Sequence, residues 1–239
     1  MSALDIVRIR AALPERGIGY YASTGSTMES AAGKPRGTVV LAEEQTAGQG
    51  RHGHSWHSEA GSGIYCSMVL DPAPLLTLAM GLATAEAITS VTGVACDLRW
   101  PNDVMAGGKK LAGILVQLVD GDAIGGIGIN VNHTAFPAEL AREATSLRLE
   151  AGRPFDREEI LLALIPAVES FASLDAGSIL RLFARASSYA AGRRVVVQQA
   201  GGVVEGVTAG LDPSGYLIVR RPDGTDTLIV AGGVRAAGA

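Results

Sequence analysis

Residues 43–56 read EEQTAGQGRHGHSW and follow an apolar run, residues 38–42 (TVVLA), that predicts a buried strand. The three glycines of the stretch permit positive φ angles and let backbone N–H groups approach a bound anion. Arg51 adds a fixed cation suited to phosphate or carboxylate, and Trp56 ends the stretch with a face on which a ring can stack. The stretch indicates either a ligand-binding loop or an ordinary glycine-rich surface loop.

The composition is that of a water-soluble globular protein. The chain has 239 residues and a formal charge of −4, which provides no broad attraction to nucleic acid or to an anionic membrane. Cys66 and Cys96 lie in apolar runs, so buried free thiols are expected rather than a disulfide. No leader peptide opens the sequence, and the longest apolar stretch, residues 72–85, is too short to span a bilayer. We therefore expect a cytoplasmic protein with no membrane partner.

Periodicity and turn residues predict an α+β fold followed by a small β unit. Strands are expected at residues 19–23, 38–42, 63–70, 95–100, 103–106, 110–118 and 123–131, and helices at 3–13, 75–92, 156–174 and 178–189. After residue 190 the pattern changes to short strands separated by Gly and Pro turns, at 193–199, 203–211, 216–221 and 227–230. This spacing is typical of a small all-β barrel of SH3-like size. We expect domains at 1–191 and 192–239.

Residues 99–103 (RWPND) place several functional groups at one predicted strand end. Asn102 has the donor and acceptor needed to read a purine edge, and Asp103 could hold Mg²⁺ through one carboxylate. Pro-Asn-Asp is also strong turn chemistry, which is the structural alternative. Lys110 begins the next strand and could point into a site there, or it could form a solvated pair with Lys109.

Other polar residues have both structural and functional interpretations. Asn130 lies in an apolar strand and needs a partner, which could be a ligand or backbone. Ser26 and Glu29 have the spacing of a helix capping box. Three loop histidines suggest a metal, but only Glu59 could complete a ligand set, so solvated side chains are favoured. These histidines are His52, His54 and His57.

Five blocks stand in the order found in biotin protein ligases, and the chain resembles that family. The blocks are residues 25–27 (GST), 45–53 (QTAGQGRHG), 100–103 (WPND), 110–115 (KLAGIL) and 128–131 (GINV). The resemblance implies a mixed sheet packed with helices, similar to class II synthetases, and an SH3-like C-terminal domain. It implies that biotin and ATP form biotinyl-5′-adenylate, after which a lysine of a biotin carboxyl carrier protein takes the biotinyl group.

The resemblance also assigns residues to roles. Biotin is expected to contact Ser26, Thr27, Met28, Gln45, Gly48, Gln49, Gly50, Arg51, Lys110 and Gly113. ATP or the adenylate is expected to contact Arg51, Trp56, Asn102, Lys110 and Asn130. Lys110 and Arg51 are the expected catalytic residues, and Asp103 is expected near Mg²⁺.

Three positions depart from the family pattern. Met28 replaces the usual Asn, Gln49 replaces an Arg, and His54 often corresponds to an Arg, so adenylate retention could rest more heavily on Arg51. A monofunctional ligase acting as a monomer or homodimer is favoured. A lipoyl or octanoyl ligase or transferase of this fold is a second enzyme hypothesis. A biotin-responsive repressor is disfavoured because no winged helix-turn-helix precedes the first strand and the chain is acidic, so no DNA partner is expected.

Overall fold

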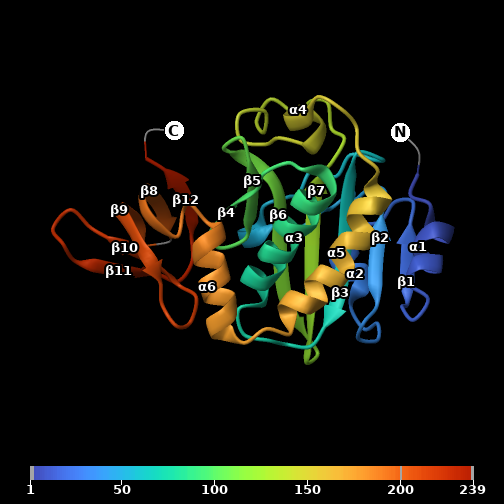
Figure 1. The fold of residues 1–239 in the computed structure, drawn as a ribbon, viewed down its shortest axis with the longest axis horizontal. Coiled ribbons are helices and arrows are strands. Elements are labelled where there is room, and N and C mark those ends of the chain that lie inside the picture. Colours follow the sequence, from blue (N-terminus) through green and yellow to red (C-terminus); the bar gives the residue numbers. More distant parts are fainter. Residues whose placement is uncertain (1–2, 200, 238–239) are drawn as a thin grey trace.

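A mixed sheet forms the centre of the molecule (Figure 1). The computed structural model describes residues 3–199 and 201–237. The sheet has seven strands in the order β1-β2-β3-β7-β6-β5-β4. Their bounds are β1 Ile18–Tyr21, β2 Val39–Ala42, β3 Gly63–Leu70, β4 Asp97–Arg99, β5 Asp103–Ala106, β6 Lys109–Val119 and β7 Asp122–Asn130. The β1–β2 pair is parallel and the other pairs are antiparallel, which confirms the expected mixed sheet.

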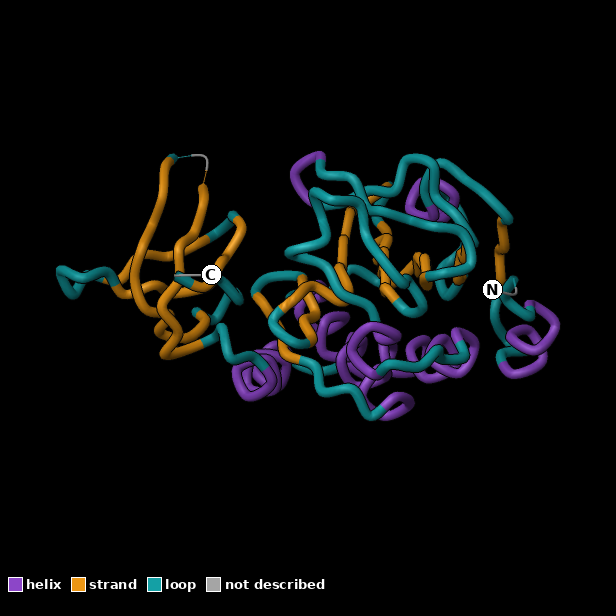
Figure 2. The backbone as a smooth tube through the Cα atoms, turned by 90° about the horizontal axis from the view of Figure 1, so that it is seen from above, coloured by secondary structure: helices purple, strands orange, loops and turns teal. Residues whose placement is uncertain are grey.

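Most of the helices pack on one face of this sheet. Their bounds are α1 Ile6–Ala12, α2 Thr27–Ala31, α3 Leu76–Thr92, α4 Leu147–Ala151, α5 Arg157–Ala172 and α6 Ala176–Ala186. Figure 2 shows the long helices α3, α5 and α6 along one side of the strands, with loops along the other. Small residues of α3, such as Ala79 and Ala83, are fully buried and allow close packing on α5 and the sheet. No helix among the described residues is long and apolar enough to cross a membrane.

The C-terminal segment forms a separate antiparallel sheet beside the first (Figure 1). Its strands are β8 Ala191–Gln199, β9 Gly202–Leu211, β10 Leu217–Arg220, β11 Asp226–Ile229 and β12 Gly233–Ala236, in the order β11-β10-β9-β8-β12. This confirms the small SH3-like β domain, and β12 adds a strand that the turn pattern had not located. Trp100 donates from Nε1 to the carbonyl of Gly215 at 2.8 Å, which ties the two sheets together. The boundary at residues 191–192 stays a prediction.

The alternation of side chains along β6 and β7 divides the sheet into a packed face and an open face. Ile114, Ile127 and Ile129 are buried in the core beneath the helices. Their neighbours Gly113 and Gly128 point to the opposite face, because successive residues of a strand alternate sides. Since glycine has no side chain, that face is bare at these positions and leaves room above it.

A buried ion pair fixes the strand end from which the glycine-rich loop begins. Glu43 follows β2, and its Oε2 accepts from Nη1 of Arg157, the first residue of α5, at 2.9 Å. Arg157 also donates to the carbonyl of Gly63 at 3.0 Å, and the Leu4 amide donates to Glu43 Oε1 at 2.6 Å. One carboxylate thus joins the N-terminal segment, the end of β2, the start of β3 and α5.

Candidate functional site

The glycine-rich loop is a short hairpin on the open face of the sheet. Trp56 N donates to the Gly48 carbonyl at 2.8 Å, and Gly50 N donates to the His54 carbonyl at 2.7 Å. A single 3-10 turn, η1 Arg51–Gly53, closes the tip. His52 has a φ of 54°, a left-handed conformation that is uncommon outside glycine. The hairpin places Arg51 and Trp56 beside the bare strands.

Gln45 joins the two ends of this hairpin to helix α2. Its Oε1 accepts from Thr27 N at 2.8 Å and from Thr27 Oγ1 at 3.0 Å. Its Nε2 donates to Ser58 Oγ at 2.9 Å, after the second arm of the hairpin. Ser67 on β3 donates to Thr27 Oγ1 at 2.8 Å, so the hydroxyl is also held from the sheet. The result is a polar floor at one end of a small pocket.

Helix α2 begins as the sequence predicts, but only half of the expected capping box forms. Ser26 caps the helix by accepting from Met28 N at 3.2 Å. Glu29 instead accepts from Gln49 Nε2 at 2.7 Å, which connects α2 to the hairpin. Met28 is buried, and its sulfur lies where a Cβ on Gly126 would be. The two departures Met28 and Gln49 therefore line the same small pocket.

Trp56 lies against the glycines of β6 and β7. A Cβ on Gly128 would overlap the indole, and one on Gly113 would lie 2.8 Å from it. The Lys110 Nζ is 5.3 Å from the ring centroid, within the range of a cation–π contact. The indole Nε1 is buried and has no hydrogen-bond partner in the described structure. Sequence reasoning placed Trp56 beside a nucleotide, whereas here it borders both the small pocket and a larger cavity.

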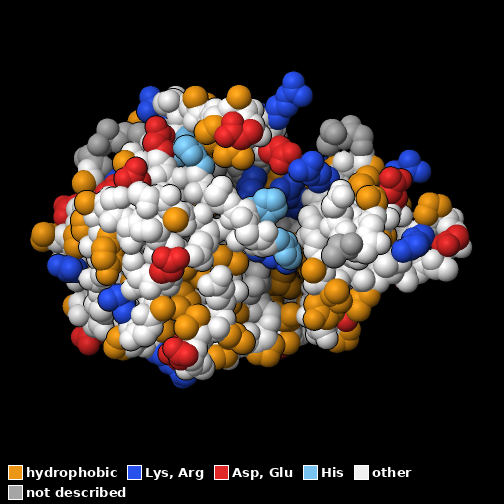
Figure 3. Space-filling model, turned by 180° about the vertical axis from the view of Figure 1, so that it is seen from behind, with side chains coloured by type: hydrophobic (Ala, Val, Ile, Leu, Met, Phe, Trp, Pro, Cys, Tyr) orange, Lys and Arg blue, Asp and Glu red, His pale blue; other side chains and the backbone are white. Residues whose placement is uncertain are grey.

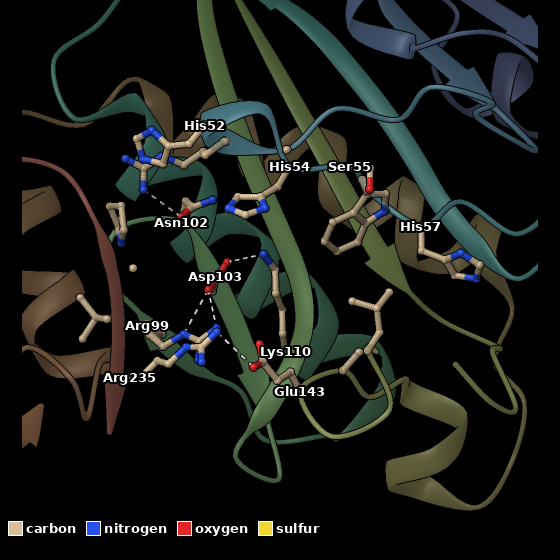
Figure 4. Close-up of a pocket in the computed structure, with 18 of the residues that line it drawn as sticks. His52, His54, Ser55, His57, Arg99, Asn102, Asp103, Lys110, Glu143 and Arg235 are labelled. Carbon is tan, nitrogen blue, oxygen red and sulfur yellow. Dashed lines mark hydrogen bonds and ion pairs between the residues drawn. The ribbon is translucent and has the colours of Figure 1, made fainter. Parts of the chain in front are cut away.

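Lys110 projects from β6 and is held by an acidic partner. Its Nζ lies 2.6 Å from Asp103 Oδ1, while Arg99 donates to Asp103 Oδ2 at 2.7 and 3.0 Å (Figure 4). Burial by itself would raise the pKa of Asp103, but Lys110 and Arg99 hold it below its usual value. Asp103 is therefore ionised at neutral pH and orients two cations.

These contacts do not fit a magnesium ion held by Asp103. Both carboxylate oxygens already have cationic partners, and Mg²⁺ prefers oxygen ligands free of such competition. The described residues contain no group of three or more His, Cys, Asp or Glu that could hold a metal. The geometry favours a role for Asp103 in positioning Lys110 rather than in holding Mg²⁺.

Arg51, at the tip of the hairpin, borders the same cavity as Asn102 and Asn130, which lie at or next to strand ends. Arg51 Nη1 donates to Asn102 Oδ1 at 3.2 Å, and Asn102 Nδ2 donates to the Ile114 carbonyl at 2.9 Å. Burial lowers the pKa of Arg51, although nearby Asp103 opposes the change. Asn130 is buried and donates to the Thr145 carbonyl at 3.0 Å, so backbone supplies one of its partners.

A cavity of about 360 Å³ opens beside Lys110 and extends to the C-terminal domain. Seen from behind, Lys, Arg and His side chains gather in a hollow between the main body and that domain (Figure 3). Gly232 and the first residues of β12, up to Arg235, supply one wall, and Arg235 pairs with Glu143 at 3.1 Å (Figure 4). With both acids of the cavity, Asp103 and Glu143, paired to cations, the space suits an anionic ligand.

The loop histidines do not converge. His52, His54 and His57 all line the large cavity, but they lie apart along it (Figure 4). The ring of His57 lies 6.0 Å from the buried His133 ring. His133 stacks on Phe136 with centroids 5.2 Å apart. Burial lowers the pKa of His133 to about 4, so the imidazole is neutral at physiological pH. That the three loop histidines are solvated rather than metal-bound stays a prediction.

Comparison with known proteins identifies the family. Residues 22–133 match the biotin/lipoate A/B protein ligase family, and residues 191–234 match the biotin protein ligase C-terminal domain. A biotin–[acetyl-CoA-carboxylase] ligase of Mycobacterium tuberculosis is 36% identical, covering 91% of this chain and 88% of that protein. The chain belongs to the biotin protein ligase family.

The fold of this family member also matches solved structures. A biotin protein ligase from Aquifex aeolicus, in complex with biotin and ATP, superimposes with a TM-score of 0.84 at 30% identity, covering 92% of this chain and 99% of that one. The bifunctional ligase/repressor BirA of Bacillus spizizenii is 35% identical over 80% of this chain. The chain spans 63% of the length of that relative.

Within this family member, the structure brings together the residues that the sequence motifs predicted. The residues expected to contact biotin line the small pocket, except Ser26 and Gly48, which do not line it. Those expected to contact nucleotide line the large cavity. Sequence reasoning missed Ser58, Glu29, Glu143 and Arg235. Glu29, Glu143 and Arg235 had a usable signal, their charge, but nothing in the sequence indicated that Glu29 bonds to the hairpin or that β12 returns to the cavity.

Proposed function

We propose that this protein is an ATP-dependent biotin protein ligase. In the first step the biotin carboxylate attacks the α-phosphate of ATP, the α–β bridging bond breaks, and pyrophosphate leaves. In the second step a lysine amine of a biotin carboxyl carrier protein attacks the acyl carbon of the adenylate and loses a proton, and AMP leaves. The products are a biotinyl amide, AMP and pyrophosphate.

The observation that carries this proposal is the meeting of two spaces at Lys110. The small pocket has polar groups at Thr27 and Gln45 and an apolar wall that includes Met28, which suits a bicyclic head group with an aliphatic tail. The large cavity is rich in cations, as a nucleotide requires. Lys110 and Trp56 border both spaces, so a carboxylate and a phosphate bound from opposite sides would meet there.

Each residue at the junction has a distinct task in this mechanism. Lys110 offsets the repulsion between the carboxylate and the α-phosphate and stabilises the charge that develops on the phosphate. Asp103 holds that ammonium in place. Arg51, supported by Asn102, contacts the phosphate of the adenylate, and backbone N–H groups of the hairpin provide further donors.

We propose Mg²⁺ as the cofactor and a biotin-accepting carrier protein as the partner. Mg²⁺ supplies charge neutralisation to the phosphates of ATP when bound; we include it as a requirement of the reaction, without assigning a protein ligand. The carrier protein is proposed as a biotin-dependent carboxylase subunit or domain. A cytoplasmic location, a monomeric or homodimeric state and the absence of a DNA partner stay predictions.

The deciding experiment is incubation of the protein with biotin, ATP and Mg²⁺, followed by mass spectrometry for biotinyl-AMP. Addition of a carrier domain should then give a mass increase at its acceptor lysine. Lipoate and octanoate in place of biotin serve as matched controls. Formation of lipoyl-AMP or octanoyl-AMP but no biotinyl-AMP would replace this proposal with the second enzyme hypothesis.

A further inference from the structure

Ser58 occupies a position at the base of the hairpin that neither the motifs nor the family match assigns. Its side chain is buried, with 7% of the residue exposed. Its Oγ lies 2.9 Å from Gln45 Nε2 and 3.3 Å from the Trp56 carbonyl oxygen. The Ser58 hydroxyl therefore connects Gln45, at the start of the loop, with Trp56, whose indole lies over β6 and β7.

The direction of these hydrogen bonds is determined by Thr27. A backbone N–H can only donate, so the Gln45 atom that faces Thr27 N must be the amide oxygen. The amide nitrogen then faces Ser58, whose hydroxyl accepts from Gln45 and donates to the Trp56 carbonyl. Without Ser58, the Gln45 amide would keep its oxygen partner and lose the partner of its nitrogen.

The Ser58 hydroxyl also lies close to the backbone of Gly48, which has no side chain, so the two ends of the hairpin are closely packed here. A Cβ at Gly48 would lie 2.6 Å from the Trp56 carbonyl oxygen, 3.0 Å from Ser58 Oγ and 3.1 Å from Gln45 Nε2. Gly48 therefore permits the two ends of the hairpin to approach each other. The contact joins residues 13 positions apart and closes the loop at its base.

We infer that Ser58 is a positioning residue of the ligase reaction: through Gln45 it orients the biotin pocket, and through the Trp56 carbonyl it keeps the hairpin closed over the adenylate. This inference rests on the proposed function. Ser58 touches neither reacting group, so its loss should weaken biotin binding and adenylate retention while leaving the chemical step at saturation nearly unchanged.

The test compares Ser58→Ala with Thr46→Ala in the full chain. Thr46 belongs to the same loop but is exposed, lines neither pocket, and donates only to the Thr24 carbonyl at 3.3 Å, so it controls for general loop effects. Ser58→Ala should raise the biotin KM by about 10-fold with kcat within about 2-fold. It should also release biotinyl-AMP about 10-fold faster, measured as labelling of lysines on a bystander protein. Thr46→Ala should match the wild type in all three.

A double-mutant cycle separates positioning from general stability. In a Gln45→Leu background, Ser58→Ala should change the biotin KM no further, because the residue through which it acts is gone. A Ser58→Ala variant that lowers only the melting temperature, or that lowers kcat with KM unchanged, would overturn the inference. A wild-type protein that forms no biotinyl-AMP would instead overturn the proposed function.

Discussion

Replacing Lys110 by alanine should slow adenylate formation by at least about 100-fold. The ammonium is partly shielded, with 30% of the side chain exposed, and Asp103 holds it in place at 2.6 Å. A unit charge about 4 Å from a developing phosphate charge contributes about 4 kcal/mol at an effective dielectric constant near 20, or about 10³-fold in rate. Because Arg51 and Arg99 still stabilise part of the phosphate charge in the variant, we expect a loss of at least about 100-fold rather than the full value.

The fold should survive this substitution, since Asp103 keeps both hydrogen bonds from Arg99. Lys109→Ala is the matched control, because that side chain is exposed and its one described bond goes to the Ala141 carbonyl at 3.3 Å. The assay is single-turnover pyrophosphate release at saturating biotin and ATP, with melting temperature as the fold check. Equal losses in the rate of pyrophosphate release for the two variants would show that Lys110 has no special role in the first step.

Three further outcomes follow from the contacts described. Arg51→Gly should still make the adenylate but release it, seen as labelling of bystander lysines; complete loss of adenylate would place Arg51 in the chemical step. Gly128→Ala should displace Trp56 and weaken biotin binding about 10-fold or more by calorimetry, and unchanged affinity would contradict the packing described. Burial gives His133 a pKa of about 4 in the folded protein, against about 6.5 in the unfolded chain. This difference corresponds to about 3 kcal/mol of unfolding free energy, which is present above pH 6.5 and is lost as the pH falls towards 4. Urea unfolding at pH 7 and 4.5 should show a smaller loss of unfolding free energy for His133→Gln than for wild type, and equal losses would contradict this assignment.

The parts of the fold that could be predicted from sequence are those with local causes. The strand Gly63–Leu70 was predicted with both of its bounds because its run is apolar and flanked by turn residues. Ser26 was recognised as an N-cap because capping is a contact between residues two or three positions apart. Lys110 was considered for the site because it begins the predicted strand 110–118, and the family resemblance gave it a role there.

The remainder depends on contacts between distant residues. Glu29 has the spacing of a capping box, yet its carboxylate bonds to Gln49, which is 20 positions away. The indole N–H of Trp100 bonds to Gly215 in the C-terminal domain, 115 positions away. Ser58 is one of many serines and has no local pattern of its own. Such partners become visible only when the chain is folded.

The carboxylate of Glu43 has a practical consequence for protein engineering. Its oxygens accept from the Leu4 amide and from Arg157, directly before the loop that carries Arg51. A truncation that removes Leu4 would leave a buried carboxylate with one donor fewer at the root of that loop. Fusion partners should therefore be attached ahead of Leu4 through a flexible spacer, so that the backbone from Leu4 onward keeps its path.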